Sequence, residues 1–517
     1  MAATLIILVA AIVAFVSGRI PLAVVAVGVA LALWATGVLE LDEALSGFGD
    51  PTVLFIAALF VVSEALEATG VTAWAGGQVV RRAGTTRTAV LLAVCLLVAV
   101  LTAFISVNGA VAALIPMVVV VATRAGIPVS HLLLPFAFTA HAGSMLLLTG
   151  TPVNIIVSEA AQDAGERAFG FFEFGLAGVP LLLGTLLIIV FLGPLLLPNR
   201  TPSELPNDLT AVTGALREQY ALPADQRLTS AERGVAEVIV APRSTLVGLH
   251  VFPGMATPSG DLVVVAVQRG GEDLTDPESA LRPGDTLLVS GTWEDLERHT
   301  SGPDVLVATP PDELRRGVPL GRGARRTVAV LLLMVLLLAT GAVPPAVAGL
   351  LAACALILSG VLTPVQAFRK IGWSTVVLVA GMIPLSTAFI TTGTADRIAE
   401  ELLGVVGQSS PRVALLAMCV LTVVLGQLIS NTATVLILVP VAAALATDLS
   451  VSVLPFMMAL AVSGAASFLT PVATPANTMV LEPGGYRFGD YGRLGLPLLL
   501  LFLAVAVLWV PVVLPFS

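Results

Sequence analysis

Charged residues are scarce in this sequence. Only 11% of the 517 residues are Asp, Glu, Lys or Arg, whereas a soluble globular protein carries about 25%. The mean hydropathy is +0.99, and the apolar runs are roughly 15–22 residues long, which suits membrane-spanning helices and not the short alternating strands of a barrel. A soluble globular protein is therefore excluded, and the sequence predicts a polytopic α-helical membrane protein.

Other familiar signatures are missing as well. The three cysteines, Cys95, Cys354 and Cys419, all lie within apolar runs, so no disulfide or metal framework is indicated. No Gly-x-x-x-x-Gly-Lys-Ser/Thr motif occurs, which argues against an ATP-driven pump. The first apolar run, 5–16, has no basic flank before it and no small-residue cleavage site, so we expect it to be retained as a helix.

The sequence does contain an internal repeat. Pairs such as Pro21 and Pro344 or Gly37 and Gly360 lie 323 positions apart. Around Ser106 and Ser430 the offset becomes 324. Matched Gly, Pro, Ser and Asn residues in the same order are improbable by chance, and internal repeats of this size in an apolar chain are typical of secondary transporters.

The apolar spans predict the path of the chain through a membrane. Ten crossings are expected, at 3–18, 21–40, 52–69, 131–160, 174–197, 327–342, 344–362, 373–391, 451–481 and 493–515. Two longer stretches, 86–123 and 411–447, have a polar centre instead of a charged loop, and we interpret them as re-entrant helical hairpins. Their irregular tips must be buried against protein or line a cavity, because lipid cannot satisfy exposed backbone.

The basic residues predict the orientation. With the N-terminus outside, most Lys and Arg fall on the inner side, as the positive-inside rule requires. The outer connections are then 40–51, 161–173 and 394–410, and the exceptions on that side are Arg167, Arg397 and Arg412. Five crossings per repeat invert the second repeat relative to the first. The predicted fold is an all-α polytopic membrane protein with two inverted repeats, each of five transmembrane helices plus a re-entrant hairpin, and a small α+β cytoplasmic insert.

The domains follow from this reading. Residues 1–197 form transmembrane repeat 1, residues 198–326 the cytoplasmic insert, and residues 327–517 transmembrane repeat 2. Within the insert, 201–230 resembles a linker in composition, and about 233–305 suffices for one small α+β domain. Short strands are expected at 235–240, 262–267 and 285–290, and a short helix at 294–299.

Two runs in the insert resemble a known domain. The segments 237–248 (EVIVAPRSTLVG) and 281–291 (LRPGDTLLVSG) are similar to the TrkA C-terminal (RCK-C) ligand-binding domain. The resemblance implies a regulatory module, with a small-molecule regulator and a tendency to dimerise.

The polar segments inside the membrane are the candidate transport site. The second hairpin tip, Ser430-Asn431-Thr432, offers hydroxyl and amide oxygens where two half-helices meet. Unwound carbonyls and such side chains bind hard cations such as sodium, while helix N-termini suit an anion. Two further loops, Thr149 to Asn154 and Ala473 to Asn477, contain a Thr-Pro-x-Asn motif deep in an overlong apolar span, where proline breaks the helix and frees carbonyls.

Together these motifs resemble the divalent anion:sodium symporter family, within the wider ion transporter superfamily, over essentially the whole chain. The resemblance implies two sodium sites and a site for the carboxylates or sulfate of the substrate. The implied substrate-binding residues are Ser106, Asn108, Gly109, Thr151, Pro152, Ser430, Asn431, Thr432, Thr474 and Pro475. The implied sodium ligands are Ser106, Asn108, Thr149, Gly150, Asn154, Ser430, Asn431, Ala473 and Asn477.

The first hairpin tip departs from this pattern. At an offset of 324 it has Val107 where the second tip has Asn431, and Asn108 in place of Thr432. At an offset of 323, Asn108 pairs with Asn431 instead, and Gly109 replaces Thr432. Either register loses a hydroxyl or an amide.

Two ionisable residues inside the apolar spans are candidates for ion coupling. His141 lies before the Thr149 loop, and Glu64 lies in the third span. The leading prediction is a secondary active, elevator-type carrier that moves a small divalent anion (dicarboxylate, sulfate or similar) with sodium. The alternatives are a proton-coupled or uncoupled anion exporter of the same superfamily, and an RCK-regulated channel, although no Thr-Val-Gly-Tyr-Gly filter occurs.

The expected cofactor is the sodium ion, and the expected partners are a small anion, the lipid bilayer and a second copy of the chain in a homodimer. A nucleic-acid partner and an enzymatic activity are not expected. The expected location is the inner or plasma membrane, as a multi-pass protein with an outer N-terminus and a cytoplasmic insert.

Overall fold

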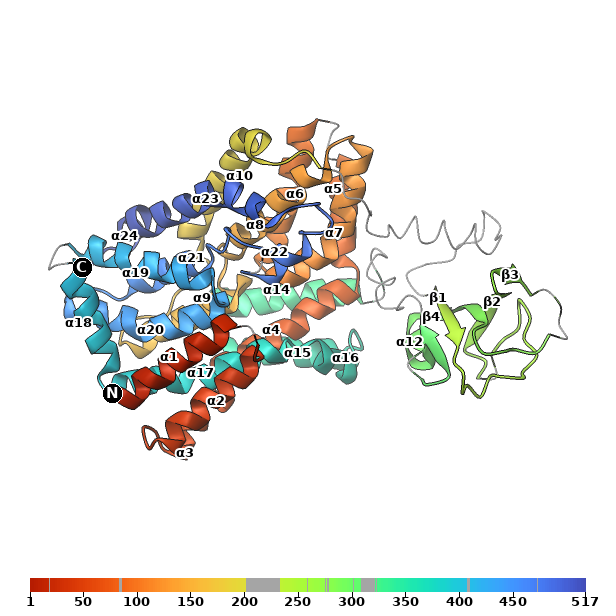
Figure 1. The fold of residues 1–517 in the computed structure, drawn as a ribbon, viewed down its shortest axis with the longest axis horizontal. Coiled ribbons are helices and arrows are strands. Elements are labelled where there is room, and N and C mark those ends of the chain that lie inside the picture. The colour runs from red at the N-terminus through yellow and green to blue at the C-terminus, as the bar shows by residue number, and fades with distance from the viewer. Residues whose placement is uncertain are drawn as a thin grey trace. The chain divides into compact units, whose positions relative to one another are not determined.

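A computed structural model describes most of the chain (Figure 1). It describes residues 1–517 except 18, 83–85, 201–232, 258, 275, 277–278, 301, 308–320, 322, 407–409 and 472. The chain divides into two compact units. The helical unit comprises Met1–Glu64, Val79–Glu204 and Val328–Ser517, and the sheet unit comprises Ala65–Gln78 and Leu205–Thr327. The predicted linker at 201–230 lies outside the described residues.

The first half of the chain consists of helices before the sheet begins. They are α1 (Ala2–Ser17), α2 (Leu22–Ala35), α3 (Leu41–Leu45), η1 (Ser46–Gly49), α4 (Pro51–Ala68), α5 (Val71–Arg82), α6 (Arg87–Thr102), α7 (Val107–Arg124), η2 (Val129–His131), α8 (Leu133–Ser144), η3 (Leu148–Gly150), α9 (Pro152–Asp163) and α10 (Gly175–Leu196).

The second half repeats this pattern of long, short and broken helices. They are α14 (Ala324–Thr340), α15 (Pro345–Leu358), α16 (Pro364–Lys370), α17 (Trp373–Thr391), α18 (Thr394–Val406), α19 (Pro411–Gly426), α20 (Asn431–Asp448), α21 (Leu454–Gly464), α22 (Pro475–Met479), α23 (Phe488–Ala504), the π-helical η4 (Val505–Trp509) and α24 (Val510–Val513).

Helices occupy all ten spans that the sequence predicted. Among the described residues, five are long and apolar enough to cross a membrane, and they cover Leu41–Ala68, Gly175–Leu196, Trp373–Thr391, Asn431–Asp448 and Phe488–Val513. The spans 131–160 and 451–481 are not continuous helices: each is broken near its middle.

Two of the expected outer connections contain helices that the sequence analysis did not predict. Within 40–51, Glu40 caps α3 in a reciprocal bond with Glu43. Within 394–410, the amphipathic α18 carries an ion pair between Arg397 and Glu401. Local capping and i,i+4 charge pairs favour short helices where hydropathy alone shows only a polar connection.

Helices from the two halves pack against each other in the helical unit. α17 contacts α2, α9 contacts α20 and α21, and α10 contacts α23 (Figure 1). Each half also contains a helix pair joined by a four-residue tip: α6 and α7 in the first, α19 and α20 in the second. These helix pairs occupy the two stretches, 86–123 and 411–447, where the sequence predicted hairpins.

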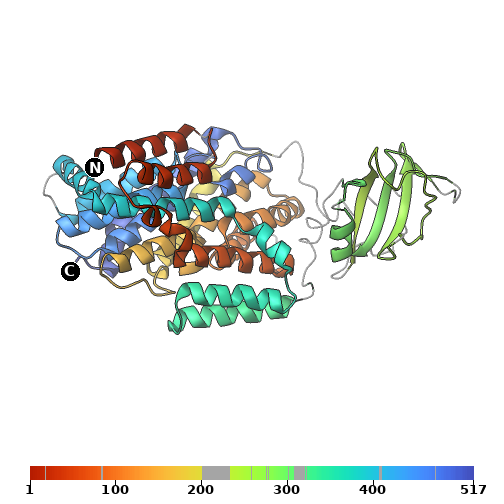
Figure 2. The same cartoon turned by 90° about the horizontal axis from the view of Figure 1, so that it is seen from below.

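The strands of the sheet unit form a five-stranded antiparallel sheet, with a helix of the insert beside it (Figure 2). Its elements are β1 (Arg233–Val240), β2 (Leu262–Arg269), β3 (Glu272–Asp273), β4 (Thr286–Thr292), α12 (Trp293–Thr300) and β5 (Val305–Val307), with the strand order β3-β2-β4-β1-β5. The three predicted strands and the predicted helix are present. Their inward side chains, with Trp293 and Leu296 of α12, form a separate apolar core.

Candidate functional site

The first Thr-Pro-x-Asn motif lies where α8 breaks from α9. Thr151 is the N-cap of α9, and Pro152 takes the first helical position, where its missing N–H costs nothing. The Asn154 side chain folds back across the break. Its Nδ2 donates to the backbone O of Ser144 at 3.1 Å and of Leu147 at 2.9 Å.

The second motif forms the same arrangement between α21 and α22. Thr474 caps α22 and Pro475 begins it. Nδ2 of Asn477 donates to the backbone O of Ser467 at 2.8 Å and of Thr470 at 3.2 Å. Both acceptors and the asparagine itself lie 323 positions after their counterparts in the first half.

Each asparagine keeps one group available. Asn154 and Asn477 are completely buried, and Oδ1 of each has no hydrogen-bond partner among the described residues. An unpaired buried acceptor costs about 1–3 kcal/mol, so two matching cases in one molecule require an explanation. Two fixed amide oxygens at helix breaks are suitable ligands for a small hard cation.

Serine caps the second helix of each hairpin. Oγ of Ser106 accepts from the backbone N of Gly109 at 3.1 Å, at the start of α7. Oγ of Ser430 accepts from the backbone N of Ala433 at 3.3 Å, at the start of α20. Both tips therefore present the N-terminus of an 18-residue helix, the end that favours an anion.

The two caps also establish the register of the tips. Because Ser106 and Ser430 have the same role, the offset here is 324, the first of the two registers considered above. Val107 then corresponds to Asn431 and Asn108 to Thr432. The first tip lacks the amide at the first helical position, and its Asn108 is exposed.

Each hairpin tip contacts the broken loop of its own half. In the first half, Oγ1 of Thr149 donates to the backbone O of Ala103 at 3.0 Å. In the second, Oγ of Ser467 donates to Oδ1 of Asn431 at 2.5 Å. Gln427 adds bonds to the loop backbone on both sides of Ser467. In each half, one predicted residue, Thr149 in the first and Asn431 in the second, thus links the hairpin tip to the broken loop.

His141 connects the two halves. Its Nε2 lies 3.3 Å from Oγ1 of Thr474, the cap of the second broken helix. The ring also packs edge-on against Phe468, with the ring centroids 5.9 Å apart. The prediction that His141 lies near the transport loops is therefore consistent with its position, whereas Glu64 lies half-buried on α4, a helix that carries none of these loops.

Backbone atoms approach closely at Gly150. A Cβ on this residue would lie 2.1 Å from the backbone O of Ser144, so only glycine fits. Its counterpart, Ala473, is buried. The first loop is therefore more compact than the second at this point.

Sequence reasoning missed Ser144, Ser467 and Gln427. Ser144 and Ser467 are 323 positions apart, so the repeat offset could have identified them as a matched pair. Gln427 has no such signal, because the residue at the corresponding position of the first tip is Ala103.

A cavity of about 200 Å³ lies between α4, α9, α17 and α20. Three carboxylates line it, those of Asp50, Glu159 and Asp163, together with hydroxyls and mostly apolar side chains. Its lining includes none of the tip or loop residues that the sequence predicted. Residues from the predicted outer connections 40–51 and 161–173 line this cavity, as does the end of α17, which precedes the third outer connection.

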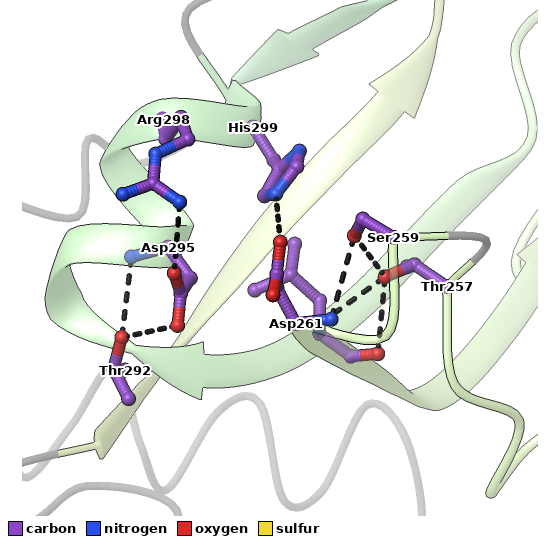
Figure 3. Close-up of polar contacts among 8 residues, drawn as sticks. Thr257, Ser259, Asp261, Thr292, Asp295, Arg298 and His299 are labelled. Carbon is purple, nitrogen blue, oxygen red and sulfur yellow. Dashed lines mark hydrogen bonds and ion pairs between the residues drawn. The ribbon is translucent and has the colours of Figure 1, made fainter.

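The sheet unit has its own polar cluster beside α12 (Figure 3). Nε2 of His299 lies 2.8 Å from Oδ2 of Asp261, which joins the end of α12 to the turn before β2. This bond holds the pKa of Asp261 below its usual range. Thr292 and Asp295 bond reciprocally at the start of the helix. The contacts orient α12 on the sheet.

Comparisons with known proteins find relatives among membrane transporters. A family model described as a citrate transporter (CitMHS) matches residues 12–407 and 335–516. The chain is 31% identical to the uncharacterised transporter YfbS of Escherichia coli, over 98% of both chains. It is 28% identical to a probable sodium/sulfate cotransporter 3 of Chlamydomonas reinhardtii, over 53% of this chain and 31% of that protein.

The fold is similar to one solved structure in particular. The crystal structure of the Alcanivorax borkumensis YdaH transporter, described as having an unusual topology, matches with a TM-score of 0.50 at 16% identity. The match covers 92% of this chain and 88% of that one. At this identity the likeness concerns the fold.

Proposed function

Since the chain belongs to the citrate transporter family, and is therefore a multi-pass membrane transporter and not an enzyme, we propose that it is a secondary active carrier of small divalent anions. Dicarboxylates, sulfate or similar anions are the proposed substrates, and sodium is the proposed coupling ion. The sodium/sulfate cotransporters among its relatives support both choices at the level of the family.

The buried amide oxygens of Asn154 and Asn477, which have no hydrogen-bond partner in the described part of the chain, are the observation that carries sodium coupling. Nδ2 of each asparagine donates to two backbone carbonyls. These bonds fix the orientation of the amide, and therefore of Oδ1, before a cation binds. The proposed ligands are Ser106, Asn108, Thr149, Gly150 and Asn154 in the first half, and Ser430, Asn431, Ala473 and Asn477 in the second.

The anion would bind between the hairpin tips and the loops. The positive ends of α7 and α20 supply backbone N–H groups and partial charge without any Lys or Arg in the tips. Asn108, Gly109 and Thr432 lie in the first turns of these helices. The other proposed contacts are Ser106, Ser430, Asn431, Thr151, Pro152, Thr474 and Pro475.

Two inverted repeats, 1–197 and 327–517, are the proposed basis of alternating access by an elevator motion. The matching bonds of Asn154 and Asn477 support the repeat. Side chains at the predicted outer connections, Asp50 and Asp163, line one cavity. Arg200 and Asp490, from two predicted inner connections, form an ion pair. Each pair of connections thus meets at one end, which supports placing its members on the same side; the proposed outer N-terminus in the inner or plasma membrane rests on the distribution of Lys and Arg.

The insert at 198–326 is the proposed regulatory part. Its sheet unit, with the core strands at 233–305, would act as a cytoplasmic RCK-C-like domain that binds a small-molecule regulator. A homodimer is the proposed assembly, because RCK-C-like domains tend to pair.

Uptake into proteoliposomes tests the function. Labelled succinate and sulfate should accumulate when an inward sodium gradient is imposed, and Asn431→Ala and Asn477→Ala should abolish sodium-dependent uptake. Thr185→Ala is the matched control, because Thr185 is also a buried residue whose hydroxyl has no described partner, but it belongs to α10 and to neither the loops nor the tips. Near-normal uptake by a well-folded Asn477→Ala protein would refute the site.

Proton coupling is the second candidate function, and the contact between His141 and Thr474 favours it. An imidazole titrates near neutrality, with an ordinary pKa of about 6.5. Sodium coupling predicts that His141→Gln keeps sodium-dependent uptake across pH. Uptake that needs no sodium, follows a pH gradient and disappears in His141→Gln would reverse the choice.

A further inference from the structure

Tyr491 holds the backbone of the second cation loop. It is a completely buried residue on α23, and its hydroxyl donates to the backbone O of Asn477 at 2.6 Å. The Asn477 side chain is already held by Ser467 and Thr470. With the backbone carbonyl also held, Oδ1 is the one oxygen of Asn477 without a described partner.

Asp490, the residue before Tyr491, anchors the start of α23. Asp490 is 4% exposed and accepts a bond from Nη1 of Arg200 at 2.7 Å and from the backbone N of Arg487 at 2.7 Å. Arg200 also donates to the backbone O of Gly485 at 2.9 Å. An ion pair with a buried carboxylate and several hydrogen bonds has a well-defined geometry. These contacts therefore fix the position of the first turn of α23, which carries Tyr491.

The ring of Tyr491 is supported as well. Tyr486 packs edge-on against it, with the ring centroids 5.9 Å apart. The hydroxyl of Tyr486 donates to the backbone O of Ser130 at 2.5 Å and accepts from the backbone N of Leu134 at 2.8 Å. These contacts join the Tyr491 side chain to the start of α8.

The first half has a similar carboxylate contact at the start of α10, but no hydroxyl that corresponds to that of Tyr491. Glu173 accepts from the backbone N of Gly170 at 2.9 Å, as Asp490 does from Arg487, and these counterparts are 317 positions apart. Glu173 pairs with Arg167 of the same loop. The counterpart of Tyr491 is then Phe174, which has no donor, so the hydroxyl contact is specific to the second loop.

We propose that Tyr491 is a positioning residue for the second cation loop, held in place by the Arg200–Asp490 pair, and that it raises cation affinity at this loop alone. The inference rests on the proposed function, because it takes Asn477 as a cation ligand. The proposed anion contacts include neither Tyr491 nor Asp490, and the Tyr491 hydroxyl bonds to Asn477, a proposed cation ligand.

Tyr491→Phe is the decisive variant, since it removes one hydroxyl and keeps the ring. The loss of one buried hydrogen bond predicts that the half-saturating sodium concentration for uptake rises about three- to tenfold. The half-saturating anion concentration at saturating sodium should stay near that of the unaltered protein. Asp490→Asn should shift sodium dependence in the same direction, and the control Thr185→Ala on α10 should not.

Sodium titration of the melting temperature gives a readout that does not require transport. Ligand binding stabilises the folded protein by an amount that grows with the logarithm of the ligand concentration relative to Kd, so Tyr491→Phe should need more sodium for the same rise in melting temperature. An unchanged sodium requirement in both Tyr491→Phe and Asp490→Asn would overturn the positioning role while leaving sodium coupling intact. An unaltered protein that neither binds nor uses sodium would overturn the proposed function and this inference together.

Discussion

Gly495 provides a strict test of the packing behind the second loop. A Cβ built on Gly495 of α23 would lie 2.2 Å from the backbone O of Phe468. Ordinary contact would require the helix and the loop to separate by about 1 Å, and overpacking of this kind costs about 1–3 kcal/mol. The loop cannot simply yield, because the preceding residue, Ser467, accepts the side-chain bond of Asn477 at 2.8 Å.

We therefore expect Gly495→Ala to lower the melting temperature in detergent and to impair uptake, because Phe468 also contacts His141. Gly489→Ala is the matched control in the same helix, since a Cβ there meets no atom within 4 Å. It should be neutral or slightly stabilising, because alanine is a better helix former than glycine by up to about 1 kcal/mol. Gly178→Ala, whose Cβ would lie 2.2 Å from the backbone O of Met145, should resemble Gly495→Ala.

The measurement is the apparent melting temperature at one fixed scan rate, with uptake measured on the same preparations. A fixed rate is needed because unfolding of a membrane protein is commonly irreversible. If Gly495→Ala had the same melting temperature and uptake as Gly489→Ala, the close approach of α23 to the loop would be refuted.

Three other expectations concern the sheet unit and the topology. Asp285→Asn should speed amide exchange in β2 and β4 about tenfold, as for one lost charged hydrogen bond, because Asp285 is buried and accepts two bonds from Arg269; unchanged exchange would contradict this. Burial opposes ionisation of Asp285, but the bonds from Arg269 outweigh burial and lower the pKa of Asp285. The stabilisation by this ion pair should therefore be complete above the unfolded pKa of about 3.9 and disappear as pH falls through the lower folded pKa. An amide-exchange rate in β4 whose dependence on this ion pair does not change in acid would argue against this expectation. After replacement of the exposed Cys354, a cysteine in 41–50 should label from outside and one in 201–230 only after permeabilisation, and the reverse pattern would overturn the proposed orientation.

The local features of the site could be predicted from the sequence. Proline at 152 and 475 breaks a helix because it lacks an N–H, and serine before a helical run caps it, so the loops and tips are where the motifs placed them. Short runs rich in Val and Leu, with turn residues nearby, similarly predicted three of the strands of the sheet unit, β1, β2 and β4. Each of these effects acts within a few residues, so a single sequence contains the information.

The choice of register at the hairpin tips needed the structure. Matching by residue type left both offsets open, because 324 pairs Ser106 with Ser430 and 323 pairs Asn108 with Asn431. The caps at Ser106 and Ser430 decide for 324, since a hydroxyl that accepts from the third following residue defines the helix start regardless of residue identity.

The long-range contacts were decided by tertiary structure alone. His141 meets Thr474, Arg200 meets Asp490, and Tyr491 reaches the backbone of Asn477. No periodicity or motif joins such residues, because whether two side chains meet depends on how whole helices pack. The sequence by itself determined which groups could bind ions and where the chain breaks; the packing of α8 and α23 against the second loop determined which of those groups are held and which remain available.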